Sequence, residues 1–103
     1  MPQAKDSLLG EVIDTFPIYK SGFDRSGEVV LCKNGIMIRH NGETAKVPFE
    51  YVKYLDAMDK MALGRVRANV NIFDQMHGNM DFVFEISDLH FDRLVKACGK
   101  KKA

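Results

Sequence analysis

Apolar and polar residues alternate along much of this chain, a pattern typical of β-strands that bury one face. The clearest run covers residues 65–73, and a second covers residues 82–86. We predict a strand in each run, with one buried and one wet face. The positions expected to be buried are Val66, Ala68, Val70, Ile72, Phe82, Phe84 and Ile86. The positions expected on the wet face are Arg67, Asn69, Asn71, Val83 and Glu85.

Shorter apolar runs predict four further strands, at residues 10–19, 28–33, 36–39 and 44–49. Pro17 removes a backbone donor from the first, so we expect that strand to bend or to lie at an edge there. Asn34-Gly35 and Asn41-Gly42 are typical of type I′ hairpin turns, in which both central residues need positive φ. Residues 20–27 are rich in Gly, Ser and Asp and are predicted to form a loop.

Helical spacing replaces the alternation near the C-terminal end of the sequence. A stripe of apolar residues at i, i+3, i+4 and i+7 predicts a helix over residues 87–98. Ser87 or Asp88 is suited to the N-cap, and Gly99 to the left-handed position after the last turn. The stripe consists of Phe91, Leu94, Val95 and Cys98.

These elements predict a mainly β (α+β) fold. Roughly five to seven short strands joined by short turns form a bent antiparallel sheet or partly open barrel, which one C-terminal amphipathic helix caps. We expect residues 1–103 to form a single domain, with an ordered core over about 9–99 and a basic tail at 100–103. Residues 52–57 fit either a short strand or one helical turn, and residues 59–64 fit no element clearly.

The composition is that of an ordinary globular domain. The chain has 103 residues, of which 46% are hydrophobic and 28% charged, which excludes disordered, collagen-like and disulfide-scaffold classes. Its 15 basic and 14 acidic residues give a net charge of +1, so we expect no nucleic-acid partner.

The sequence shows neither a signal-peptide stretch nor an apolar run near the ~18 residues of a membrane-spanning helix. We therefore expect a cytoplasmic protein. Cys32 and Cys98 are interpreted as two buried small apolar residues, which suits a reducing compartment, and a single disulfide between them is the alternative.

Three stretches resemble the pleckstrin-homology-like (PH-like) superfold, and within it the GRAM-type domains. Residues 28–38 look like the second and third strands of that superfold around a tight turn. Residues 44–52 look like its valine-proline-phenylalanine element, and residues 82–98 like its last strand and C-terminal helix. A weaker likeness, in the strand–turn–strand–valine-proline run, is to the N-terminal part of the archaeal chemotaxis adaptor family.

The PH-like resemblance implies a scaffold for binding, because proteins of this superfold bind peptides, other proteins or inositol phospholipids. The expected function is a non-catalytic protein-binding module that acts as an adaptor or scaffold. Two alternatives remain: a peripheral membrane or inositol-phospholipid binding domain, and a domain like the archaeal chemotaxis adaptor.

The sequence offers little catalytic chemistry. His40, His77 and His90 show no short metal-ligand spacing to another His or to a Cys, and they are interpreted as solvated polar residues. Neither a glycine-rich phosphate loop nor a nucleophile elbow is found. We expect a protein that is not an enzyme and that uses neither cofactor nor metal.

Apolar residues in or beside predicted loops are the candidates for protein binding. They are Met58, Met61, Leu63, Met76 and Met80. Flexible thioethers suit adaptable contact surfaces, and the competing interpretation is that Met61 and Leu63 close the end of the core.

The lipid alternative depends on the segment between the first two predicted strands. There Lys20 and Arg25 would contact an anionic headgroup, with Phe23 as an apolar probe. Exposed strand edges offer a further alternative, in which the domain self-associates as a homodimer.

Overall fold

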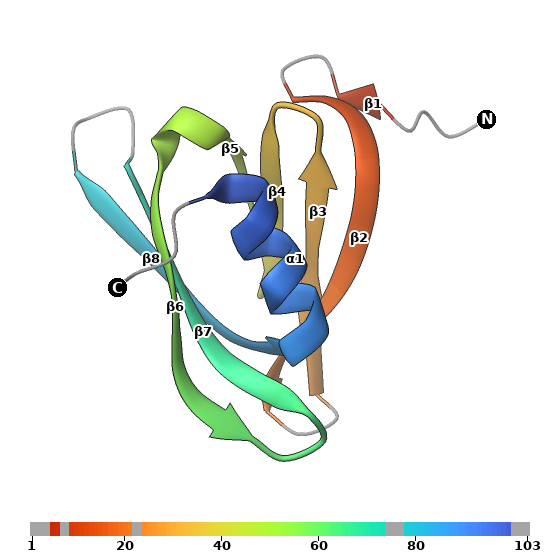
Figure 1. Ribbon diagram of the computed structural model, residues 1–103, viewed down its shortest axis with the longest axis vertical. Coiled ribbons are helices and arrows are strands. Elements are labelled where there is room, and N and C mark those ends of the chain that lie inside the picture. Colours follow the sequence, from red (N-terminus) through yellow and green to blue (C-terminus); the bar gives the residue numbers. More distant parts are fainter. Residues whose placement is uncertain (1–4, 7–8, 22–23, 74–77, 100–103) are drawn as a thin grey trace.

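The computed structural model contains one antiparallel sheet followed by a helix (Figure 1). The structure describes residues 5–6, 9–21, 24–73 and 78–99. The elements in chain order are β1 (Lys5–Asp6), β2 (Gly10–Ser21), β3 (Asp24–Cys32), β4 (Gly35–His40), β5 (Glu43–Pro48), the 3₁₀ turn η1 (Phe49–Tyr51), β6 (Val52–Met61), β7 (Arg65–Phe73), β8 (Asn79–Ser87) and α1 (Asp88–Cys98). The expected fold class, a bent antiparallel sheet with one C-terminal helix, is confirmed.

The sheet has the order β5-β4-β3-β2-β8-β7-β6, with β1 paired to the start of β2, and it is not closed into a barrel. β2 pairs with β3 from Val12 to Ser21 but with β8 only at Ile18 and Tyr19. The two halves of the sheet therefore splay apart above this seam, and α1 lies between them (Figure 1). Pro17 comes just before Ile18, the first residue of β2 that pairs with β8. Its missing N–H therefore removes no hydrogen bond between β2 and β8.

The main core fills the space between the two halves and α1. All seven positions expected to be buried on β7 and β8 are buried, as are Phe91, Leu94 and Cys98 of the helix. Val95 is half-buried against the same core. The predicted alternation and helical stripe are thus confirmed, and each large side chain here contributes about 1.5–3 kcal/mol of transfer free energy.

A second, smaller cluster lies on the other face of β3 and β4. It consists of Leu9, Val30, Cys32 and Met37, with Val12 packed against it. Cys32 belongs to this cluster and Cys98 to the main core, and both are buried thiols. Their interpretation as buried apolar residues is therefore confirmed, whereas the second cluster was not expected from the sequence.

The hairpin between β3 and β4 differs from its prediction. Cys32 pairs with Gly35, so the connecting residues are Lys33 and Asn34, and neither Asn34 nor Gly35 has positive φ. The turn is held instead by two backbone hydrogen bonds of 2.8 Å each. The N–H of Lys33 donates to the carbonyl oxygen of Glu11 in β2, and the N–H of Asn34 donates to the carbonyl oxygen of Leu9. Gly35 is needed for a close approach, because a Cβ atom there would lie 2.4 Å from the carbonyl oxygen of Val47.

The second predicted hairpin turn is confirmed. Asn41 and Gly42 connect β4 to β5 with φ values of 53° and 84°, as a type I′ turn requires.

The prediction of a loop over residues 20–27 is wrong. β2 continues to Ser21 and β3 begins at Asp24, so most of this segment is strand. Gly27 suggested a loop, but it is a strand residue that faces the backbone of β4 at very short distance. The polar residues of this segment fit a strand because they lie at the exposed end of the hairpin.

Residues 52–57, which fitted either a short strand or one helical turn, form a strand, because β6 covers Val52–Met61. The 3₁₀ turn lies just before them, at residues 49–51. Register shifts at Lys53 and Met58 break the alternation within β6, which explains why its pattern was unclear in the sequence.

The predicted helix is confirmed as Asp88–Cys98, with Gly99 in the left-handed conformation after it. Ser87 occupies the N-cap position, but its side chain makes no capping hydrogen bond. Instead, the backbone N–H of Asp88 donates to the carbonyl oxygen of Gly64 at 2.9 Å. The start of α1 is therefore attached to the turn between β6 and β7.

Candidate binding groove

A groove lies where the β6–β7 turn meets the start of α1. Its volume is about 460 Å³, which is within the range of ligand-binding clefts. The hydrogen bond between Asp88 and Gly64 fixes one side of it against the other. The groove is lined by Lys60, Met61, Leu63, Gly64, Arg65, Val66, Ser87, Asp88 and Leu89. Two of the residues predicted for protein binding, Met61 and Leu63, are thus brought together here.

Two leucines at the edge of this groove are strongly exposed. The exposed fractions are 61% for Leu63 and 74% for Leu89. Leu63 also has φ of 65°, a left-handed conformation that costs an ordinary L-residue roughly 1–2 kcal/mol. Both leucines therefore present apolar surface to solvent, and Leu63 does so from a strained turn.

A nearly buried ion pair supports one side of the groove. The Arg65 guanidinium lies 3.6 Å from the ring centroid of Tyr19 and 3.8 Å from the carboxylate of Glu85. The exposed fractions of the Arg65 and Glu85 side chains are only 10% and 7%. Tyr19 and Glu85 are paired where β2 meets β8, so this side of the groove is held by the seam of the sheet.

The other apolar candidates lie elsewhere. Met61 pairs with Arg65 at one end of β7, whereas Met80 pairs with Ile72 near its other end, roughly 23 Å along the strand. Met58 is exposed at a register shift in β6, and Met76 lies outside the described residues. The structure therefore does not gather the five candidates into one patch.

The cations of the lipid hypothesis have acidic neighbours. Lys20 lies 3.8 Å from Asp24, and Arg25 lies 3.3 Å from Glu28. Arg39 of β4 also contacts Glu28, at 3.0 Å, a contact that follows from the pairing of β3 with β4 and was not expected from the sequence. Phe23 lies outside the described residues. These contacts reduce the positive charge available to an anionic headgroup.

His40 is held in its neutral form near this end of the sheet. Burial lowers the pKa of its imidazole, Glu43 opposes the shift and Lys20 adds to it. The side-chain amide nitrogen of Asn41 lies 3.3 Å from Nε2, which fits Nε2 as the acceptor. Nδ1 then carries the proton and donates to the Ser26 hydroxyl at 2.8 Å.

The face expected to be wet on β7 and β8 is partly buried. Asn71 and Glu85 are buried, which corrects the prediction that they are solvated. The Oδ1 atoms of Asn69 and Asn71 are also buried and accept no hydrogen bond. An unsatisfied buried polar atom costs about 1–3 kcal/mol. Cross-strand neighbours cover these side chains, and strand alternation alone does not predict that.

A comparison with protein-family models found no matching family, and a comparison with curated proteins found no match. Residues 5–6, 9–21, 24–73 and 78–99 contain no helix long and apolar enough to cross a membrane. Within the same residues, no three His, Cys, Asp or Glu side chains are grouped so that they could hold a metal ion. His77 lies outside them, and His90 stacks on Phe16 with ring centroids 4.8 Å apart.

Proposed function

We propose that this chain is a non-catalytic protein-binding module that holds an extended segment of a partner protein in the groove between the β6–β7 turn and α1. The observation that carries the proposal is the pair of strongly exposed leucines, Leu63 and Leu89, at the edge of a concave surface. Binding of a partner that removes these apolar side chains from water lowers the free energy of the complex.

The architecture supports a module of the PH-like type. A bent antiparallel sheet with a C-terminal helix between its halves is the arrangement that the resemblance implies. The hydrogen bond from Asp88 to Gly64 attaches the start of α1 to the β6–β7 turn, so the two sides of the groove are held together before a partner binds. A preformed groove reduces the entropy lost when a segment binds.

The charges of the groove favour a partner segment with an acidic residue beside an apolar one. Lys60 is exposed and makes no ion pair with any described residue, whereas the charge of Arg65 is compensated by the nearly buried carboxylate of Glu85. Among the residues that the structure describes, Asp88 is the only acidic one that lines the groove. An apolar side chain of the partner would contact Leu63 and Leu89, while a neighbouring carboxylate would face Lys60.

Selection from a random peptide library displayed on phage tests this proposal. We expect selected peptides to pair an apolar with an acidic residue. The double variant Leu63→Asn, Leu89→Ser should weaken their binding at least about tenfold, because two apolar contacts are lost. Asn tolerates the left-handed conformation of residue 63, so this variant should still fold. Ile13→Ser is the matched control, because Ile13 is 63% exposed on β2, away from the groove.

Equal binding of the selected peptides to the double variant and to the wild-type protein would contradict the groove as the site. Loss of binding in Ile13→Ser as well would place the contact elsewhere. A Lys60→Glu variant should change the preference from acidic to basic peptides, and an unchanged preference would contradict the inferred partner chemistry.

A further inference from the structure

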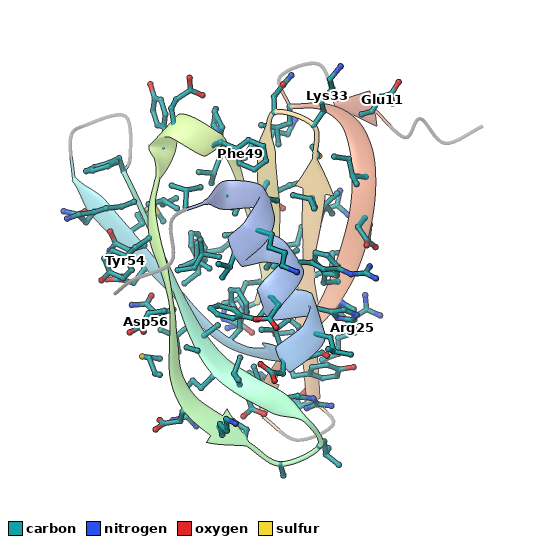
Figure 2. The ribbon with its side chains drawn as sticks, viewed as in Figure 1. Glu11, Arg25, Lys33, Phe49, Tyr54 and Asp56 are labelled. Carbon is teal, nitrogen blue, oxygen red and sulfur yellow. The ribbon has the colours of Figure 1, made fainter. Side chains whose placement is uncertain are left out.

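A second polar site lies on the face of β6, β7 and β8 that points away from the main core. Asn69 and Asn71 are two residues apart on β7 and therefore share that face, roughly 6.6 Å from each other. Asp56 of β6 pairs with Asn69, and Asp81 of β8 pairs with Asn71. We call Asp56, Asn69, Asn71 and Asp81 the acceptor strip. Figure 2 shows Asp56 on the side of β6 away from α1.

The two asparagines leave carbonyl oxygens without partners. Asn71 is only 5% exposed, and its Nδ2 donates to Asp81 Oδ1 at 2.7 Å, which fixes the orientation of the amide. The Oδ1 atom of Asn71 is therefore directed away from that carboxylate, and it accepts no hydrogen bond. Oδ1 of Asn69 is likewise buried without a donor. Two adjacent acceptors thus lie between two carboxylates.

Neither carboxylate of the strip forms an ion pair within the described residues. Asp56 makes no ion pair or hydrogen bond within the described residues, and Asp81 accepts a hydrogen bond from Asn71. Lys53 lies instead over the Phe73 ring, 5.6 Å from its centroid, and 3.5 Å from Asn79. The strip therefore combines two negative charges with two unsatisfied oxygens, and it is complementary to a cation that carries several donors.

We propose that the acceptor strip binds the guanidinium group of an arginine side chain of a partner protein. A guanidinium is planar, carries five N–H donors and accepts no hydrogen bond, so one group can donate to both amide oxygens and to a carboxylate. A single divalent ion fits less well, because the described residues contain no group of three His, Cys, Asp or Glu side chains that could hold a metal ion.

Binding requires a small movement at this face, because both amide oxygens are covered. Tyr54 pairs with Asn71 across β6 and β7 and is half-buried beside it. Because Tyr54 is the cross-strand neighbour of Asn71, the proposal places the required movement at its side chain. The site is distinct from the groove, since none of its four residues lines the groove.

Nuclear magnetic resonance of the ¹⁵N-labelled chain tests the proposal, with N-acetyl-arginine amide as the probe. We expect saturable shifts of the side-chain amide resonances of Asn69 and Asn71. Asp56→Asn should raise the dissociation constant about tenfold, which corresponds to ~1.4 kcal/mol, because a charge-assisted contact is lost. Asp59→Asn is the matched control: Asp59 is exposed on the same strand and is not part of the strip.

Three results would overturn the proposal. The first is the absence of saturable shifts at Asn69 and Asn71. The second is an equal response to N-acetyl-citrulline amide, which lacks the charge, or to N-acetyl-lysine amide, which lacks the planar donors. The third is an equal effect of Asp56→Asn and Asp59→Asn. The Leu63→Asn, Leu89→Ser variant should bind the arginine probe normally, so the two sites are tested separately.

Discussion

Replacement of Gly27 by alanine tests whether the close contact between β3 and β4 determines the stability of this sheet. A Cβ atom at residue 27 would lie 1.9 Å from the carbonyl oxygen of Arg39. Ordinary contact begins near 3.4 Å, so the two backbones must separate by about 1.5 Å at this point. That shift disrupts the pairing of Gly27 with His40 and the 3.0 Å hydrogen bond from the backbone N–H of Asn41 to the carbonyl oxygen of Ser26.

The expected loss in the free energy of unfolding is about 2–6 kcal/mol, from overpacking and from two weakened backbone hydrogen bonds. Overpacking contributes about 1–3 kcal/mol, and each weakened backbone hydrogen bond adds roughly 0.5–1.5 kcal/mol. Domains of this size are stable by about 5–15 kcal/mol, so Gly27→Ala should remove a substantial part of the stability of the fold.

Urea unfolding followed by circular dichroism measures this difference, with Gly42→Ala as the matched control. Gly42 has φ of 84° but open space around its Cβ position, so alanine there costs only the backbone strain of about 1–2 kcal/mol. If the two variants lose the same free energy within about 0.5 kcal/mol, the steric argument is refuted. A Gly27→Ala protein that is unfolded without urea, beside a folded Gly42→Ala protein, agrees with it.

Two further predictions concern charged groups. Glu85→Gln should destabilise the fold by about 3 kcal/mol in urea unfolding, because it leaves the nearly buried Arg65 without its carboxylate. Glu28→Gln, at a more exposed site, should cost less than about 1 kcal/mol, and equal losses would contradict this reasoning. Burial lowers the pKa of His40, so the folded state binds fewer protons than the unfolded state. The stability of the wild-type protein relative to His40→Asn should therefore fall as the pH drops below about 6.5, and a constant difference between pH 8 and pH 5 would refute it.

Regular periodicity made part of the fold predictable. β7 was predicted with its observed bounds, because its alternation is uninterrupted from Arg65 to Phe73. The helix was predicted within one residue, since its apolar stripe is complete and Gly99 ends it in the left-handed conformation. Asn41 and Gly42 were predicted correctly because their turn requires positive φ at both positions.

Other features depend on contacts between distant segments and were not predictable from local pattern. Gly27 and Gly35 were interpreted as turn residues, yet both are glycine because a neighbouring strand leaves no room for a Cβ atom. The strand β6 was obscured because register shifts at Lys53 and Met58 break its alternation.

The candidate site was predictable only in part for the same reason. Met61 and Leu63 were singled out as apolar residues beside loops, and they do line the groove. Leu89 was not, because the helical pattern gives no sign that its exposed face meets a turn 25 residues earlier. The acceptor strip was missed because alternation assigns Asn71 to the wet face, whereas its cross-strand neighbours bury it.

The seam between β2 and β8 connects the stability of the fold to the geometry of the groove. Arg65 lines the groove, but the groups that hold its guanidinium, Tyr19 and Glu85, do not. The position of this side of the groove is therefore set by the contacts of Arg65 with Tyr19 and Glu85, which a peptide in the groove would not touch. If binding uses a preformed surface, as the exposed and strained Leu63 indicates, loosening this contact should weaken binding even where the apolar edge is intact.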